Sequence, residues 1–385
     1  MVVLHANLVV EDVSMKSVML FLVVCITWLS SIAATPQVKN VTAMQQYPWG
    51  KVYITYEVVG NVAASATKGQ TVFLWVQATD KTSGIKGVAT SLTDLPNFHS
   101  YLSGDVGMES GLHKIVWDIG AQGISLNSTN VAFSIKYSDE VYIVVDLSSG
   151  NNATSYPVSY LYAVPSGGWT DEYKTTKLVL RRIEPGVFMM GGSTSTTISK
   201  AFYMGIFEVT QKQYQLVIGS NPSEYQNDMR PVEKVSFDTI RGQSIGQNSF
   251  IGKLRTRAGL NFDLPTEAQW EYACRAGTTS DYNNGGSSEN DLKKLGRYSD
   301  NQSDGKGGYS QHTKVGSYQP NAWNLHDMHG NVLEWCLNVG WEGCRVIRGG
   351  SWVNSAWRCT SSQWANEPSS REYNHLGFRL LLTLQ

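Results

Sequence analysis

The sequence predicts two domains of different fold class: an all-β domain, followed by an α+β domain with little regular secondary structure. Three observations support this prediction. The chain has 385 residues, a length typical of two or three domains. Its first part alternates apolar and polar residues at a period of two, as half-buried strands do. Its last part is dense in Gly, Asn, Trp and Cys, which is typical of irregular, tightly packed loops.

The alternating pattern extends from about residue 37 to residue 165. Its clearest stretches are Lys51–Val58, Thr71–Thr79, His113–Ile119, Val131–Tyr137 and Val141–Leu147. Turn residues separate these stretches, and helical periodicity is almost absent, so we predict an antiparallel β-sandwich of immunoglobulin or fibronectin type. A run of Pro, Ser and Gly then predicts a linker at residues 166–176 and a second domain at residues 177–385.

Residues 1–34 have the pattern of a secretory signal peptide. Met15 and a lysine precede an apolar run that ends in small residues at Ala33 and Ala34. A transmembrane anchor is the alternative, although Ser30 and Ser31 interrupt the run. We therefore expect translation to start at Met15, no membrane span after cleavage, and a secreted, periplasmic or cell-surface protein.

Composition excludes one class of partner. The formal net charge is -1 and only 16% of the residues are charged. A nucleic-acid-binding protein would show a strongly basic surface instead. We expect no nucleic-acid partner.

Helix starts can be located in the second domain. Thr210 is suited to cap one helix, and Thr266 with Gln269 three residues later forms a capping-box pattern for another. Trp270 and Cys274 lie four residues apart, which places them on one face of the second helix. We expect that face to point into the core.

Five motifs in this domain occur in a characteristic order: FEVTQKQY, RPVEKVSFD, LPTEAQWEYACRAGT, NLHDMHGNVLEWCLNVGWEGCRVIRGGSW and LGFRLL. In this order they resemble the formylglycine-generating enzyme domain, also called the sulfatase-modifying-factor domain. The resemblance covers residues 177–385. It implies an α+β, C-type-lectin-like fold, with the last motif closing the chain as a strand.

The resemblance also implies a calcium site. The matching positions are Asp327, Gly330, Val332 and Glu334, where two side chains and two main-chain carbonyls would supply hard oxygen ligands. The alternative is that Asp327 caps a turn, while Glu334 forms a salt bridge with Arg345 or Arg348. Calcium is the cofactor that we expect, in a structural role.

Four cysteines remain once Cys25 leaves with the signal peptide, and a secreted chain favours disulfides. The resemblance implies a Cys274–Cys359 disulfide. We expect Cys336 and Cys344 to form the second, with free buried thiols as the alternative.

The family's oxidase activity needs two cysteines shortly after Gly-Gly-Ser, where soft thiolates bind copper(I). Here the stretch reads GGSWVNSAWRCTSS, and Asn354 stands at the first of those positions. An amide is neither a soft ligand nor a participant in thiol exchange, so we do not expect copper. The vacated groove would be lined by Trp352, Asn354, Trp357, Trp364 and Asn366. Core packing is the alternative for these tryptophans, and we expect it for Trp352.

Three functions remain open. The first is a secreted, non-catalytic module that binds a protein or a glycan. The second is an oxidase that converts a sulfatase cysteine to formylglycine through another cysteine arrangement, such as a reactive Cys336 or Cys344. The third is a structural surface or coat component assembled by the β-sandwich.

Overall fold

The computed structural model describes residues 2–4, 37–46, 50–60, 71–95, 100–124, 131–302 and 311–384. The chain divides into two compact units, Met1–Asp139 and Glu140–Gln385. Apart from β1 (Val2–Leu4), the predicted signal region lies outside the described residues. Within the described ranges, no helix has the length and apolar character that crossing a bilayer requires.

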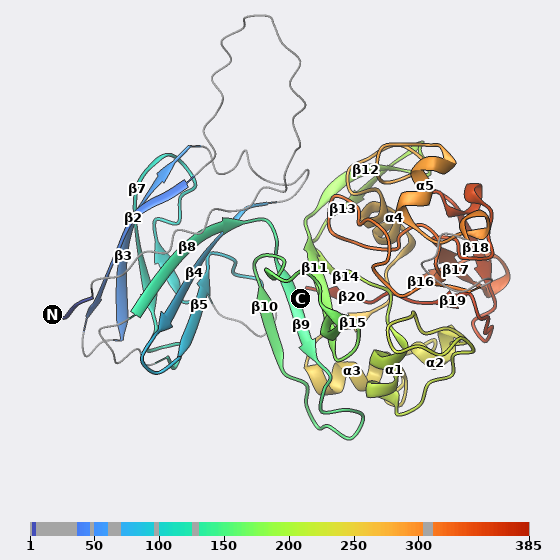
Figure 1. The fold of residues 1–385 in the computed structure, drawn as a ribbon, viewed down its shortest axis with the longest axis horizontal. Coiled ribbons are helices and arrows are strands. Elements are labelled where there is room, and N and C mark those ends of the chain that lie inside the picture. The colour runs from blue at the N-terminus through green and yellow to red at the C-terminus, as the bar shows by residue number, and fades with distance from the viewer. Residues whose placement is uncertain are drawn as a thin grey trace, which may run out of the picture. The chain divides into compact units, whose positions relative to one another are not determined.

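The first unit contains two antiparallel sheets (Figure 1). One has the order β1-β2-β3-β7-β6, with β2 (Gln37–Gln46), β3 (Lys51–Val59), β6 (Leu102–Gly104) and β7 (Gly111–Asp118). The other has the order β5-β4-β8, with β4 (Phe73–Asp80), β5 (Lys86–Thr90) and β8 (Val131–Ser138). Alternate residues of both sheets, such as Ile54 in β3 and Val76 in β4, join one hydrophobic cluster. The period of two is thus confirmed, and the assignment to an immunoglobulin or fibronectin sandwich stays a prediction.

The strand predicted at Val141–Leu147 forms, but in the second unit. It is β9 (Tyr142–Asp146), which pairs with β10 (Val158–Leu161) on one side and β11 (Lys177–Ile183) on the other. The second unit therefore begins at Glu140, ahead of the linker predicted at 166–176. Alternation identifies a strand, but it does not determine which strand becomes its hydrogen-bonding partner.

The second unit is built on a six-stranded sheet of order β10-β9-β11-β14-β20-β15, completed by β14 (Phe202–Gly205), β20 (Leu381–Thr383) and β15 (Phe262–Asp263). A separate hairpin pairs β12 (Gly186–Met190) with β13 (Thr194–Ile198). A four-stranded sheet has the order β18-β17-β16-β19, with β16 (Leu333–Val339), β17 (Arg345–Arg348), β18 (Trp364–Glu367) and β19 (Leu376–Gly377). The last predicted strand is therefore two short strands in two different sheets.

Helices α1 (Gln211–Ile218), α2 (Phe237–Ile240) and α3 (Phe250–Ala258) gather at one end of the second unit, with α4 (Glu267–Arg275) near the β12–β13 hairpin and α5 (Glu289–Leu295) beyond it (Figure 1). Both predicted caps are confirmed. Thr210 and Thr266 each accept a hydrogen bond from the backbone N–H three residues on, and each forms a capping box. Trp270 and Cys274 are fully buried, as their shared helix face predicted.

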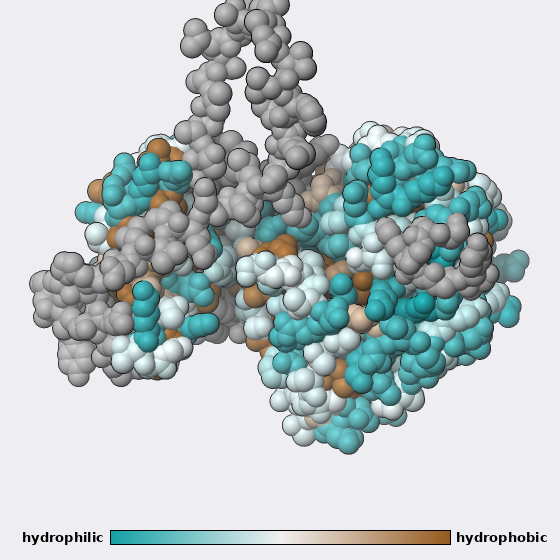
Figure 2. Space-filling view, in the orientation of Figure 1, coloured by the Kyte–Doolittle hydropathy of each residue, from teal (hydrophilic) through white to brown (hydrophobic). Residues whose placement is uncertain are grey.

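The core of the second unit lies between α4, the six-stranded sheet and the four-stranded sheet. Met204, Trp270, Cys336 and Leu381 come from these elements and belong to one cluster. Figure 2 shows that the drawn face of this unit is mainly hydrophilic, with small and separate hydrophobic areas. Most apolar side chains of this unit are buried, which is consistent with that surface.

Candidate functional site

Residues 351–375 form an irregular segment that runs from the end of β17 to β19. It includes η5, a 3-10 helix at Ala356–Cys359, and the edge strand β18. All five residues predicted to line a groove lie in this segment. Because so little of it is regular, its shape depends on contacts with the rest of the unit.

Trp352 anchors the start of the segment. Its side chain is only 6% exposed, as expected for a core residue. Its Nε1 donates a hydrogen bond to the Asn374 carbonyl at 3.3 Å, and its ring meets the Tyr225 ring edge-on at 5.8 Å between centroids. The two ends of the segment are therefore held together.

Arg348 and Ser361 anchor the middle of the segment. The buried Arg348 guanidinium donates to the Ser361 carbonyl at 3.2 Å and forms ion pairs with Glu267 and Glu271 at 2.7 and 3.0 Å. The Ser361 backbone N–H and hydroxyl both donate to the Asp281 carbonyl, at 2.8 and 2.9 Å. Such buried polar contacts rigidify an otherwise irregular chain.

A small groove opens between η5 and β18. It has an accessible volume of about 30 Å³ and is lined by Leu333, Ile347, Arg348, Gly350, Asn354, Arg358, Gln363, Trp364 and Ala365. Two of the predicted residues, Asn354 and Trp364, thus lie in its wall. Sequence reasoning missed Arg358 and Gln363, whose only signal is that they follow the Gly-Gly-Ser stretch.

The other predicted residues lie around the groove. Trp357 is 57% exposed, and the Arg358 guanidinium carbon lies over its ring, 4.6 Å from the centroid. Asn366 lies near the β16–β17 hairpin, where its Oδ1 accepts a hydrogen bond from the Trp341 N–H at 3.4 Å. The structure therefore brings together only part of the predicted set.

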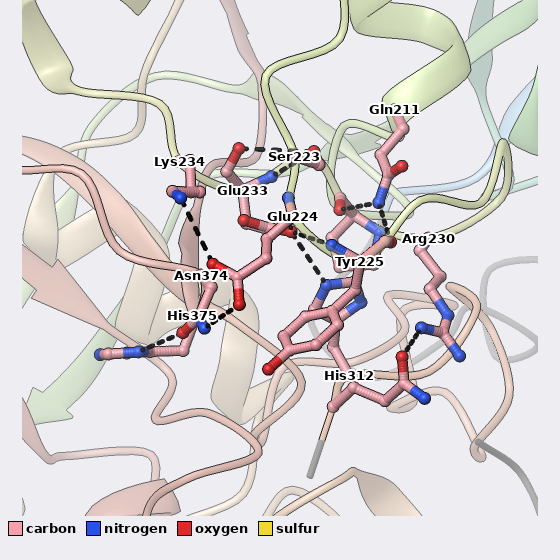
Figure 3. A network of polar contacts seen from close by, with 12 residues as sticks. Gln211, Ser223, Glu224, Tyr225, Arg230, Glu233, Lys234, His312, Asn374 and His375 are labelled. Carbon is pink, nitrogen blue, oxygen red and sulfur yellow. Dashed lines mark hydrogen bonds and ion pairs between the residues drawn. The ribbon is translucent and has the colours of Figure 1, made fainter. Parts of the chain in front are cut away.

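A polar network around Tyr225, whose ring contacts Trp352, was not predicted (Figure 3). Its centre is Glu233, a fully buried carboxylate whose Oε1 accepts the N–H groups of Glu224 and Tyr225 at 2.6 and 2.9 Å. Glu224 in turn accepts from Asn374 Nδ2 at 3.2 Å and from Lys234 Nζ at 3.3 Å. The network therefore holds Tyr225 against Trp352. Its sequence signal was the glutamate that follows Val232 in RPVEKV.

His312 packs within the same network. Its Nε2 is 3.7 Å from Glu233 Oε1, and its ring meets the Tyr225 ring edge-on, as Figure 3 also shows. Burial lowers the pKa of His312. The neutral imidazole is fully buried and packs against Tyr225, so it supports the chain around that residue and has no access to solvent.

The predicted calcium loop has a different arrangement. Glu334 is buried and forms an ion pair with Arg379 at 2.8 Å, while its other oxygen accepts from Trp270 Nε1 at 2.7 Å. The salt-bridge alternative is therefore right in kind, but its partner is Arg379 and not Arg345 or Arg348. Sequence reasoning could not find it, because the two residues lie 45 positions apart.

Asp327 also has protein partners. Its Oδ2 accepts the Gly316 N–H at 2.6 Å, its Oδ1 has no partner among the described residues, and burial raises its pKa to about 6. The neighbouring Glu208 accepts from Asn331 Nδ2 and the Val332 N–H, at 2.6 and 3.2 Å, and burial raises the pKa of its carboxyl group too.

The predicted calcium loop is tightly packed around Gly330. Gly330 has a φ of 86° and packs so closely on Arg297 that any side chain would collide with its carbonyl. Among the described residues, no group of three or more His, Cys, Asp or Glu could hold a metal ion. Calcium binding stays a prediction, and the Arg379 guanidinium already neutralises Glu334.

The predicted disulfides are not present, because all four cysteines are free. Cys274 and Cys359 belong to separate hydrophobic clusters. The His329 imidazole bridges them: its Nε2 is 3.8 Å from Cys274 Sγ, and its Nδ1 donates to the Cys359 carbonyl at 2.7 Å.

Cys336 and Cys344 are separated by the register of the β16–β17 hairpin. Trp335 pairs with Ile347, whereas Cys344 lies opposite Gly340, to which it is hydrogen-bonded through its carbonyl. Cys336 lies in β16, and Gly340 follows the end of that strand four positions later, roughly 10 Å or more along an extended chain. A disulfide requires Cα atoms within about 7 Å.

The fold and the five motifs define the C-terminal unit as a sulfatase-modifying-factor domain. The family model described as "Sulfatase-modifying factor enzyme 1-like domain" matches residues 170–384, and the chain belongs to this family.

Relatives of this chain carry names that describe different activities. "Chaperone protein LppX" of Paenibacillus barcinonensis is 31% identical over 45% of this chain and 78% of its own length. "Formylglycine-generating enzyme" of Streptomyces coelicolor is 32% identical over 30% of this chain and 45% of its own. "Inactive C-alpha-formylglycine-generating enzyme 2" of Mus musculus is 33% identical over 30% and 41%. The chain thus spans less than half the length of the two relatives that are named as formylglycine-generating enzymes.

Among solved structures, "Treponema denticola variable protein 1" is similar, with a TM-score of 0.45 and 25% identity over 54% of this chain and 95% of that one.

Proposed function

We propose that this protein is a non-catalytic, extracytoplasmic binding protein that presents its ligand site on segment 351–375. The observation that carries the proposal is Asn354. Two residues separate it from Gly-Gly-Ser, and it lines the groove. The resemblance to the family's oxidases implies that this is the position of their first copper-binding cysteine. A carboxamide cannot replace a thiolate as a ligand for copper(I).

The state of the remaining cysteines supports this reading. None of the residues described as lining the groove is a cysteine. Burial raises the pKa of the Cys274 and Cys359 thiols to about 12, and it raises that of Cys336 as well. The thiolate is the species that binds metal and exchanges with a substrate thiol, so these three groups are inert at neutral pH.

The anchored segment supports binding. Trp352 holds the two ends of the segment together and Arg348 binds Ser361 in its middle, so that the segment keeps its shape without a ligand. A preorganised surface loses less conformational entropy when a ligand binds. This role is compatible with the names of two relatives, one called "Inactive" and one called "Chaperone".

A formylglycine-generating oxidase is the second candidate, since a named enzyme of that type is among the relatives. One cysteine, Cys344, is only partly buried and could react. It would have to act without Cys336, from which the hairpin register separates it.

A copper(I) titration with a chromophoric chelator as competitor, together with mass spectrometry of a sulfatase-type cysteine peptide, tests the proposal. We expect no stoichiometric copper uptake and no loss of peptide thiol. Tight copper binding together with formylglycine formation would instead establish the oxidase. An Asn354→Gln variant is the matched control and should behave like the parent protein.

A further inference from the structure

The chemistry of the groove indicates a class of ligand, if the proposed binding role holds. We propose that the groove between η5 and β18 binds a saccharide that carries a carboxylate. Three features of the groove and its rim support this: a guanidinium without an ion pair among the described residues, two exposed indole rings and two amide groups.

The guanidinium is that of Arg358. Among the described residues it makes no ion pair, and its neighbour is the Trp357 ring at 4.6 Å. The described lining of the groove contains two arginines and no acidic side chain. Arg348 is already neutralised by Glu267 and Glu271, so Arg358 is the available cation. A guanidinium binds a carboxylate through two parallel charge-assisted hydrogen bonds.

The indole rings are those of Trp364 in the wall and Trp357 beside it. They are 43% and 57% exposed, which leaves a large part of each ring in contact with water. Covering such a ring is favourable, and the apolar C–H face of a pyranose has a matching size and shape.

The amides are those of Asn354 and Gln363. Asn354 Oδ1 accepts the Ser351 hydroxyl at 2.8 Å, and Gln363 Nε2 donates to the Trp364 carbonyl at 3.3 Å. These bonds fix both amides and leave the Asn354 nitrogen as a donor and the Gln363 oxygen as an acceptor. Sugar hydroxyls can satisfy both groups.

The volume of the groove limits how such a ligand can bind. About 30 Å³ is room for a carboxylate or a hydroxymethyl group, but not for a whole sugar ring. The carboxylate would therefore enter the groove toward Arg358, and the ring would lie across Trp364 outside it. This geometry is compatible with binding of the terminal sugar of a saccharide, or of one sugar within a longer saccharide.

Calorimetry on the full-length protein tests the inference with two pairs of probes. Each pair compares an acidic saccharide with a neutral counterpart: trigalacturonic acid with its methyl ester, and 3′-sialyllactose with lactose. We expect at least one acidic probe to bind about tenfold or more tightly than its counterpart, the effect of one charge-assisted contact. Tetraglutamate, an acidic peptide, is expected to bind more weakly than that probe.

Variants assign the contacts. Arg358→Gln should remove the preference for the acidic member, and Trp364→Ala should weaken both members of the pair. Arg371→Gln and Trp341→Ala, an exposed arginine and an exposed tryptophan outside the lining, should change neither. Circular dichroism of each variant checks that it is folded.

Equal binding of acidic and neutral probes, binding that Arg358→Gln leaves unchanged, a preference for tetraglutamate, or no binding of any saccharide would overturn the inference. The copper titration on the same preparation distinguishes that failure from failure of the proposed function. Copper uptake with peptide oxidation would overturn the non-catalytic role, whatever the saccharides do.

Discussion

Arg379 and Glu334 form a buried, two-pronged ion pair in the centre of the second unit. Arg379 Nη2 is 2.8 Å from Glu334 Oε1, Arg379 Nε is 3.1 Å from both carboxylate oxygens, and both side chains are at most 1% exposed. The guanidinium also donates to the carbonyls of Gly205 and His326, at 2.9 and 2.8 Å. One side chain thus connects β14 of the six-stranded sheet, β16 of the four-stranded sheet and the loop at His326 that precedes β16.

Arg379→Gln is expected to destabilise the second unit strongly. It leaves Glu334 buried without its cation, and breaking a buried pair in this way costs about 3–5 kcal/mol. Urea unfolding followed by tryptophan fluorescence measures the change. Arg371→Gln is the matched control, because the Arg371–Glu367 pair is exposed and should contribute less than about 1 kcal/mol. A similar small loss for both variants would show that the buried pair does not connect the sheets as described.

Stability should fall with acidity because of His329. This imidazole is fully buried, its Nδ1 donates to the Cys359 carbonyl and its Nε2 accepts the Asn283 N–H at 3.1 Å. Burial lowers its pKa from 6.5 to about 4. Between these values the unfolded chain binds a proton that the folded chain does not. The contribution of His329 is therefore complete above pH 6.5 and is lost as the pH falls toward 4, about 3 kcal/mol in total.

Urea unfolding at a series of pH values checks this dependence. The His329→Gln variant should be less stable than the parent at neutral pH, and its stability should fall less between pH 6.5 and 4. Parallel curves for the two proteins would contradict the assignment to His329.

Only one thiol should react in the native protein lacking residues 1–34. Cys274, Cys336 and Cys359 are fully buried, whereas Cys344 is partly accessible in the β16–β17 hairpin. With Ellman's reagent we expect one thiol in buffer and all four in guanidinium chloride. Cys344→Ser should abolish the native reaction, and Cys336→Ser should leave it intact. Fewer than four thiols after denaturation would show that disulfides form in the protein.

Several features of the second unit were predictable because they depend on residues close together in the chain. The capping boxes at Thr210 and Thr266 are an example, since a side chain and a backbone N–H three positions apart satisfy each other. The burial of Trp270 and Cys274 follows in the same way from the helical repeat. Motif order was sufficient to identify the family.

Groove residues were predicted less completely. Asn354 and Trp364 line the groove, as predicted. Trp352 lies in the core, and Asn366 contacts Trp341 in the β16–β17 hairpin. Arg358 was not predicted, because an exposed arginine in an irregular segment has no distinguishing sequence pattern. Its significance depends on the absence of an acidic neighbour among the described residues, which is a property of packing.

By itself, the sequence determined the strand periodicity, the helix caps, the family and the presence of Asn354 shortly after Gly-Gly-Ser. Each of these is contained in residue identities or in spacings of a few positions. Tertiary structure alone decided that β9 joins the second unit, that Glu334 pairs with Arg379, and that the four described cysteines are not joined by disulfides. The physical reason is that strand pairing and buried ion pairs join distant residues, whose approach depends on how the whole chain packs.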